Sequence, residues 1–319
     1  MARGRIAITR KMGIAALMAA CIFACHAPIR AGDLPLWLDE TPPPRQAEEP
    51  EPANPAQKRE FTLFHPTPRA LMREFQSDRP SQTEGPYTVD AGHLQIELDL
   101  ANYAYDRSLP GGQQGRVQQL LIAPTNFRIG LLNDLELDVI ATPFIWERDE
   151  DFIARTANQR EGIGDTLLRL KLNLIGNDSG NVAFALLPFI KVPTNQDRLG
   201  NRYVEGGIIF PLDLKLPASF ELGMETEVDF LHDAAGAGYH ENWVNSIVLQ
   251  HDIIREKLVG YVEFFSAVSN ERHAGPLETI DTGLLLAITS DVQLDCGVNF
   301  GITRRATDFN PFVGLSVRF

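Results

Sequence analysis

The last nine residues, Pro311-Phe312-Val313-Gly314-Leu315-Ser316-Val317-Arg318-Phe319, are apolar at every second position and end on an aromatic carboxyl terminus. Successive side chains of a β-strand point to opposite faces, so Val313, Leu315, Val317 and Phe319 share one face. Bacterial outer-membrane barrels carry aromatic residues at the edges of their apolar band. The ending therefore predicts the last strand of a barrel, with Phe319 facing lipid and Arg318 facing the lumen.

The same alternation recurs from residue 88 onward and is broken by turn signals. In residues 94–100, leucine and isoleucine alternate with Gln95, Glu97 and Asp99. Tight turns such as Asn133-Asp134 predict hairpins. Residues 87–319 accommodate about twelve strands, an even number that is typical of single-chain bacterial barrels. We therefore predict an all-β fold, a transmembrane antiparallel up-and-down barrel over residues 87–319.

The predicted connections alternate between short and long. The long ones are expected over residues 106–116, 147–161, 194–202, 232–241, 270–279 and 303–308. Short periplasmic turns and long extracellular loops give outer-membrane barrels this alternation, and an even strand count then places both termini in the periplasm. A soluble β-sandwich also alternates, but soluble strands average only about five or six residues.

The first 86 residues differ from the rest. A basic start and an apolar stretch from Met12 to Cys25 predict a cleaved signal peptide over residues 1–31 and export to the outer membrane. Residues 32–86 include proline-rich acidic runs such as Thr41-Pro42-Pro43-Pro44. Such a composition buries little apolar surface, so we expect a periplasmic linker or mobile tail. A plug or a partner-docking segment is the alternative.

Charged positions on the inward face of the predicted strands define a candidate lumen. They are Glu97, Asp99, Glu136, Asp138, Arg169, Lys171, Glu221, Glu225, Glu227, Asp229, Glu263 and Arg318. The excess of acids favours a cation-preferring or neutral-solute pathway over an anion channel. A packed salt-bridge network with no open pore is the alternative. The formal net charge of -13 also argues against a nucleic-acid partner, which requires a basic face.

The stretch from Ser77 to Glu97, SDRPSQTEGPYTVDAGHLQIE, resembles the opening of a family of Gram-negative outer-membrane transporters, the meta-pathway phenol-degradation family. The likeness continues through Gly162-Ile163-Gly164-Asp165 and the final strand, and it covers residues 77–319. It implies an outer-membrane barrel and uptake of small aromatic or other hydrophobic compounds.

Three charged residues of this opening motif, Asp78, Arg79 and Glu84, can hold the chain where it enters the barrel. Arg79 then pairs with Asp78, with Glu84 or with a lumenal carboxylate. The alternative is a solvated charged linker.

We predict a channel or transporter and not an enzyme, because no serine is tied to a histidine by the spacing of a lipid hydrolase. The pairs His232-Asp233 and His240-Glu241 can bind a cation but lack helix-borne ligand spacing, so no metal or other cofactor is predicted. The expected partners are outer-membrane lipid, a small-molecule solute and the barrel-assembly machinery, with Phe319 as assembly signal. A non-conducting structural or partner-binding barrel is the alternative function.

Overall fold

The computed structural model describes residues 58–109, 113–234, 236–271 and 274–319. The predicted signal peptide, and residues 32–57 of the predicted linker, lie outside these described residues. Within the described part of the chain, no helix has the length and apolar character needed to cross a membrane.

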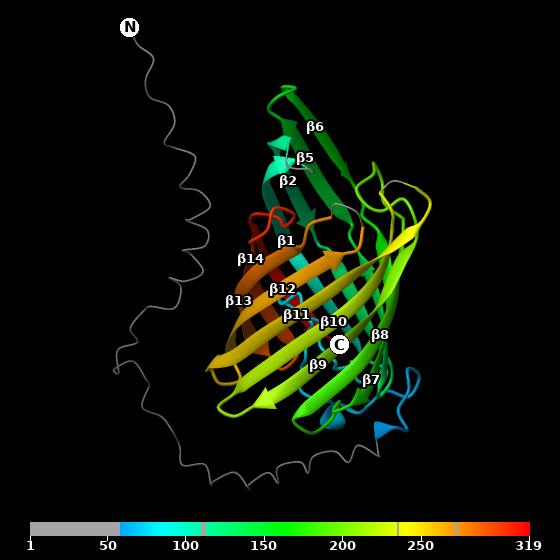
Figure 1. Cartoon of the computed structure of the whole chain (residues 1–319). Coiled ribbons are helices and arrows are strands. Elements are labelled where there is room, and N and C mark those ends of the chain that lie inside the picture. Colours follow the sequence, from blue (N-terminus) through cyan, green and yellow to red (C-terminus); the bar gives the residue numbers. More distant parts are fainter. Residues whose placement is uncertain (1–57, 110–112, 235, 272–273) are drawn as a thin grey trace, which may run out of the picture. The chain divides into compact units, whose positions relative to one another are not determined.

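One short 3-10 helix, η1 (Arg69–Leu71), precedes fifteen β-strands in the described residues (Figure 1). The strands are β1 (Leu94–Leu109), β2 (Gln113–Ile122), β3 (Thr125–Leu132), β4 (Leu135–Ala141), β5 (Phe144–Asp151), β6 (Thr156–Gly162), β7 (Thr166–Ile175), β8 (Val182–Val192), β9 (Glu205–Leu216), β10 (Phe220–His232), β11 (Tyr239–Ile254), β12 (Leu258–Ser269), β13 (Leu277–Thr289), β14 (Val292–Gly301) and β15 (Asn310–Arg318).

Twelve of these strands form a closed antiparallel ring in the order β15-β14-β13-β12-β11-β10-β9-β8-β7-β4-β3-β1. The ring closes where the last strand pairs with the first, with Gln95 opposite Arg318 and Leu98 opposite Leu315. The predicted barrel of about twelve strands is confirmed. We call the end where β15 stops and β1 begins the C-terminal rim, and the opposite end the far rim.

The remaining strands, β2, β5 and β6, continue the sheet beyond the far rim and project from it in Figure 1. Residues 94–98 of β1 pair with β3, whereas residues 102–109 pair with β2. The breaks between β2 and β3 and between β4 and β5 contain Pro124 and Pro143. Proline has no N–H to donate to a ladder, so it interrupts two long strands that otherwise cross the wall and extend past it.

The expected long loops over residues 106–116 and 147–161 are wrong. Their described residues belong mainly to β1, β2, β5 and β6. The sequence there is polar on both faces, as in Arg148, Asp149 and Glu150. A ladder that projects beyond the apolar band has water on both sides and needs no alternation, so the pattern resembled that of a loop.

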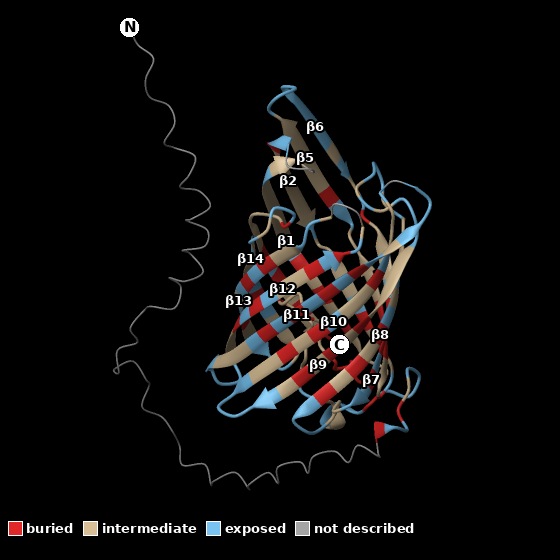
Figure 2. Ribbon diagram, viewed as in Figure 1, coloured by how far each residue is buried: buried red, intermediate tan, exposed pale blue. Residues whose placement is uncertain are grey.

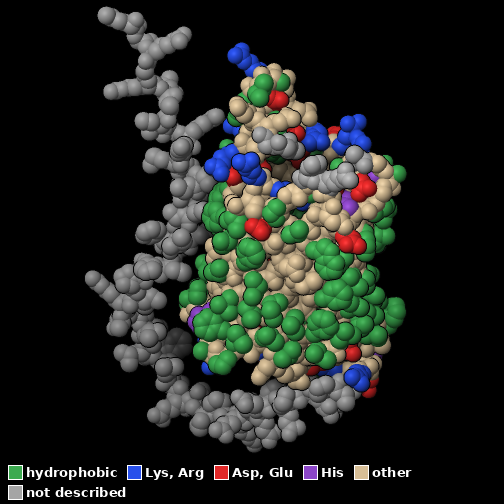
Figure 3. Space-filling view, viewed as in Figure 1, with side chains coloured by type: hydrophobic (Ala, Val, Ile, Leu, Met, Phe, Trp, Pro, Cys, Tyr) green, Lys and Arg blue, Asp and Glu red, His purple; other side chains and the backbone are tan. Residues whose placement is uncertain are grey.

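Burial alternates along the wall strands (Figure 2). On β11, Trp243 and Ile247 are 45% and 43% exposed, whereas the intervening Val244 and Ser246 are both 6% exposed. Hydrophobic side chains cover much of the outer surface in Figure 3, and charged side chains gather toward the far rim. The interior is polar, because many of the fully buried side chains are charged. This inside-out distribution matches a barrel that faces lipid.

Candidate functional site

We call residues 58–93 the inner segment. It begins at the C-terminal rim, where Phe64 is 93% exposed, and its later residues enter the ring and contact opposite arcs of the wall. The backbone N–H of Thr83 donates to Oε1 of Glu263 on β12 at 2.7 Å. The backbone N–H of Val89 donates to a carboxylate oxygen of Glu136 on β4. β12 and β4 stand six places apart in the twelve-strand ring. The inner segment therefore crosses the lumen from one side to the other.

The described part of the predicted linker, residues 58–86, is thus bound to the wall, whereas the sequence favoured a mobile tail. The physical reason is that its polar groups find partners on the strands. A segment that cannot bury apolar surface in a core of its own is ordered here by hydrogen bonds and ion pairs to a polar interior.

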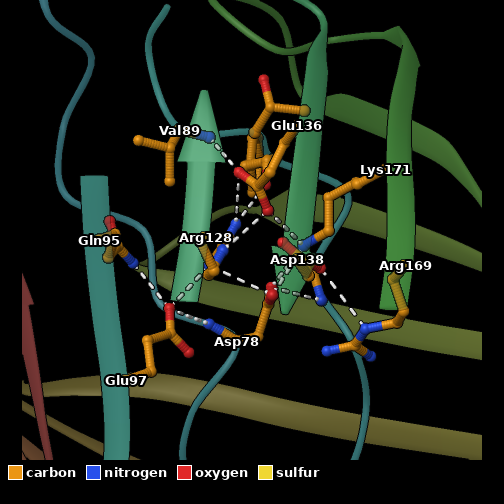
Figure 4. A network of polar contacts seen from close by, with 12 residues as sticks. Asp78, Val89, Gln95, Glu97, Arg128, Glu136, Asp138, Arg169 and Lys171 are labelled. Carbon is orange, nitrogen blue, oxygen red and sulfur yellow. Dashed lines mark hydrogen bonds and ion pairs between the residues drawn. The ribbon is translucent and has the colours of Figure 1, made fainter. Parts of the chain in front are cut away.

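A charged cluster joins the inner segment to β3, β4 and β7 (Figure 4). Asp78 Oδ2 lies 2.7 Å from Nζ of Lys171 and 3.2 Å from Nη1 of Arg128. Arg128 also pairs with Glu97 at 2.7 Å and with Glu136 at 2.8 Å. All five side chains are at least nine-tenths buried. Two bases therefore compensate three acids, and Arg128 is the branching point because its planar guanidinium offers donors in several directions.

Arg79 makes a second connection, to the seam of the barrel. Its Nη2 lies 2.5 Å from Asp99 on β1 and 2.8 Å from Asp295 on β14. Gly314 on β15 makes room for it, because a Cβ at that position would stand 2.1 Å from the same Nη2 atom. The sequence left Asp78, Glu84 or a lumenal carboxylate open as the partner of Arg79. In the structure, Arg79 pairs with lumenal carboxylates.

Glu84 completes the motif at which the chain enters the barrel. Its carboxylate pairs with Arg169 on β7, and Nε of Arg169 also lies 3.4 Å from Asp138. All three charged residues of the sequence motif, Asp78, Arg79 and Glu84, therefore bind the wall.

A further group of ion pairs lies at the C-terminal rim. Nζ of Lys58 is 2.7 Å from Asp90 and 2.6 Å from Asp178, which belongs to the β7–β8 turn. Nη2 of Arg73 lies 3.2 Å from Asp178. Burial raises the pKa of Asp178, but the attraction of Arg73 and Lys58 outweighs burial, so its pKa is below the ordinary value.

Part of the lumenal wall carries acids that form no ion pair, although Lys215 of β9 lies opposite Glu221 in the ladder. Among the described residues, the inward carboxylates of β9, β10, β12 and β13 have no Lys, Arg or His nitrogen within 4.0 Å in any recorded ion pair. We call them the base-free face: Glu205, Asp213, Glu221, Glu225, Glu227, Asp229, Glu263 and Asp281. By contrast, the inward acids of β1, β4 and β14 are paired with Arg79, Arg128 or Arg169.

Several carboxylates of the base-free face accept hydrogen bonds. Glu263 and Glu225 accept backbone N–H bonds from the inner segment. On β10, Oδ2 of Asp229 accepts from Asn242 at 3.1 Å, whereas its buried Oδ1 has no hydrogen-bond partner. These donors are neutral, so Lys215 is the only lysine or arginine of these four strands that offsets the negative charge of this face.

A cavity of about 1070 Å³ lies between the inner segment and the base-free side of the wall. It extends to the C-terminal rim and is lined by charged and aromatic side chains, including Glu221, Lys215, Phe75 and Tyr87. Nζ of Lys215 lies 5.8 Å from the ring centroid of Tyr87. The inner segment therefore leaves part of the lumen free at this end of the barrel.

The twelve charged positions predicted from parity all lie in strands and are buried or half-buried. Arg318 reaches the C-terminal rim, where its Nη2 is 2.9 Å from Asp291. Phe319 is 58% exposed, as its lipid-facing parity predicts, and its N–H donates to the carbonyl of Leu94 at 2.8 Å. Sequence reasoning missed Lys58, Arg73 and Thr83. Arg73 and Thr83 lie close to the charged motif in the sequence, but Lys58 does not, and all three have partners far away in the sequence.

One group within this site has the oxygen ligands that a cation would need. Carboxylate oxygens of Asp78, Glu136 and Asp138 lie within 4.8 Å of one another. Arg128 and Lys171 already compensate them, so this group is an ion-pair network.

Comparison with solved structures gives the same fold. An outer-membrane channel from Pseudomonas putida F1 matches with a TM-score of 0.55 and 11% identity, covering 76% of this chain and 100% of that chain. The NanC porin matches with a TM-score of 0.45 and 10% identity, over 70% of this chain and 98% of that one. The CymD monoaromatic hydrocarbon channel has a TM-score of 0.39 and 9% identity, over 71% and 87%. No curated protein matches the chain.

The likeness to the Pseudomonas putida channel shows that the chain has the fold of an outer-membrane β-barrel channel. The family model described as "Putative MetA-pathway of phenol degradation" matches residues 77–319, which is more than half of the chain, and the chain therefore belongs to that family.

Proposed function

We propose that the protein conducts small cationic and neutral solutes, aromatic compounds among them, past the inner segment and along the base-free face. In this proposal the C-terminal rim faces the periplasm and the far rim faces the cell exterior. The observation that carries the proposal is the distribution of ion pairs around the lumen. Bases of β3, β7 and the inner segment pair with the acids of β1, β4 and β14, whereas the acids of β9, β10, β12 and β13 form no ion pair and share their face with one lysine, Lys215.

An isolated negative charge inside the lumen is energetically costly. A carboxylate that leaves bulk water must pair with a cation or take up a proton. Those of the eight groups that remain ionised create a negative potential in this confined space, which raises the local concentration of cations and lowers that of anions. Neutral solutes are not repelled, so their passage depends on size and on the surfaces they meet.

The cavity supports a solute of modest size. Its volume of about 1070 Å³ is at the upper end of the range for small-molecule pockets, roughly 300–1000 Å³. Phe75 and Tyr87 of the inner segment contribute aromatic surface to it. The family description refers to phenol degradation, and an aromatic solute could stack on such rings while acids and amides face water.

Liposome swelling with a panel of solutes tests this function. The panel contains phenol, a neutral sugar, a cationic amino acid and an anionic amino acid, and protein-free liposomes serve as the control. We expect swelling with phenol and the cationic amino acid, and the slowest swelling with the anionic one. A non-conducting structural barrel, which the many contacts of the inner segment would also suit, admits none of the four.

A further inference from the structure

We propose that Asp233, His240 and Glu271 bind a divalent transition-metal ion, with Zn²⁺ as the representative, at the far rim of the barrel. One potential ligand atom from each side chain lies within 4.8 Å of the other two. An imidazole nitrogen with two carboxylate oxygens is a ligand set that zinc and similar ions accept, and it leaves a coordination position for water. This site lies outside the inner segment and its ion pairs.

The backbone register brings the three ligands together. His240 is opposite Leu231 in the β10–β11 ladder, and Asp233 follows Leu231 by two residues. On the other side, Asn242 is opposite Ser269 in the β11–β12 ladder, and Glu271 follows Ser269 by two residues. Side chains two residues apart in a strand share a face. His240 therefore lies on the same face of β11 as Asn242, and the loops that follow β10 and β12 bring Asp233 and Glu271 next to it.

Backbone hydrogen bonds hold the two contributing loops in place. The N–H of Asp233 donates to the carbonyl of Gly238 at 3.0 Å. The N–H of Ala234 donates to Oε1 of Glu271 at 2.9 Å, which joins the β10–β11 loop to the β12–β13 loop. Nδ1 of His240 lies 3.0 Å from Oδ1 of Asp233, and the His240 side chain is 10% exposed. Ligands held in this way lose little freedom when an ion binds.

The negative charge of the Asp233 and Glu271 carboxylates can be compensated by a bound cation. Among the described residues, neither Asp233 nor Glu271 has an ion pair with lysine or arginine. This differs from the group of Asp78, Glu136 and Asp138, where Arg128 and Lys171 supply the positive charge. The imidazole ligand favours a transition metal over Ca²⁺ or Mg²⁺, which prefer oxygen ligands only.

An ion at this position would link the two loops and would lie beyond the base-free face. His240 is two residues further along the inward face of β11 than Asn242, which contacts Asp229. The ion would therefore add positive charge at one end of the acidic wall. Binding itself does not depend on solute conduction, so the two proposals can fail separately.

Calorimetric titration of the purified full-length protein with Zn²⁺, in detergent and without a polyhistidine tag, tests the site. We expect saturable binding of one ion per chain, and a loss of affinity of more than about tenfold in the His240→Gln variant. His251→Gln is the matched control, because His251 lies at the other end of the same strand and stacks on Phe220. Ca²⁺ should bind more weakly than Zn²⁺.

Two further variants keep the test decisive. Asp233→Asn and Glu271→Gln each remove one carboxylate and should also lower Zn²⁺ affinity, even where the histidine variant folds poorly. The proposal is wrong if the wild-type protein shows no saturable Zn²⁺ binding. It is also wrong if His240→Gln binds as tightly as the wild type, or if His251→Gln loses as much affinity as His240→Gln. The Asp233–His240 contact would then be only a hydrogen bond within the loop.

Discussion

The carboxylate of Asp78 and the ammonium group of Lys171, 93 positions apart in the sequence, lie 2.7 Å from each other inside the barrel. This contact connects the inner segment to β7, and Lys171 is fully buried. Removing one member of a buried ion pair leaves an uncompensated charge, at a cost of about 3–5 kcal/mol. The inner segment is therefore part of the folded barrel, and the charges on its two sides depend on each other.

Substituting Lys171 with methionine should loosen the inner segment, because Asp78, Glu136 and Asp138 then share fewer positive charges. Tryptic cleavage after Arg73, whose side chain is 8% exposed, is expected to accelerate. The Asp78→Asn, Lys171→Met double variant should be closer to the wild type than Lys171→Met alone, since it removes the uncompensated acid together with the base. Equal cleavage rates in the wild type and both variants would show that the pair does not hold the segment.

Gly314 should tolerate no side chain while Arg79 occupies its present position. A Cβ there would overlap the Arg79 guanidinium, so Gly314→Ala should destabilise the seam by about 1–3 kcal/mol, the usual cost of overpacking. Heating samples before gel electrophoresis measures this effect. A folded barrel migrates faster than the unfolded chain, so the temperature at which the faster band disappears reports unfolding. Gly275→Ala is the control, because a Cβ at Gly275 meets no atom within 4 Å. A Gly314→Ala barrel as heat-resistant as the control would contradict the observed packing.

Acid should release the C-terminal-rim contacts of the inner segment. The pKa of Asp178 is lowered in the folded protein, so its ion pairs contribute stability that is fully present above the ordinary value of 3.8 and is lost as the pH falls through the lower, folded value. We expect the protection of backbone amides in residues 58–73 against hydrogen exchange to be constant from neutral pH to about pH 5 and to fall only below about pH 4.

The Asp178→Asn variant supplies the control for this pH dependence. It lacks the titrating carboxylate that contacts Lys58 and Arg73, so residues 58–73 should show at neutral pH the weaker protection against hydrogen exchange that the wild type shows only in acid. If the variant retains the full acid response of the wild type, another group is responsible.

Deleting Phe319 should impair membrane insertion more than transport by the molecules that do insert. Its N–H bonds to Leu94, and its terminal oxygen lies 2.8 Å from Nδ1 of His93, so the deletion removes contacts at the seam as well as the aromatic signal. The fraction of protein recovered as folded barrel after export measures insertion, and solute flux per folded barrel measures transport. Phe319→Tyr preserves the ring and the backbone contacts and should insert normally.

The strands could be predicted from the sequence because lipid and the polar lumen impose opposite demands on neighbouring residues. On β10, Glu225, Glu227 and Asp229 face inward while Phe230 is 50% exposed, and this alternation is visible in the sequence. The ladder formed by β2, β5 and β6 could not be recognised, because strands surrounded by water show no such contrast.

The position of the inner segment was also beyond the sequence pattern. Lys58 pairs with Asp178, 120 positions later, and Thr83 bonds to Glu263, 180 positions later. These contacts form only when the ring is closed. The sequence near Lys58 therefore does not indicate them. The charged motif of Asp78, Arg79 and Glu84 indicated that the chain enters the barrel there. The sequence predicted charged partners for the motif but did not identify which residues of the wall they are.

The reversal potential of the channel in a planar bilayer, under a tenfold KCl gradient, tests the central claim most directly. Because of the base-free face, we expect a reversal potential whose sign shows that K⁺ is more permeant than Cl⁻. A unit charge about 6 Å from an ion in water contributes about 0.7 kcal/mol, or roughly threefold in local concentration. The Glu221→Gln, Asp229→Asn variant should therefore shift the potential measurably toward zero. A wild-type channel that prefers chloride would contradict the account.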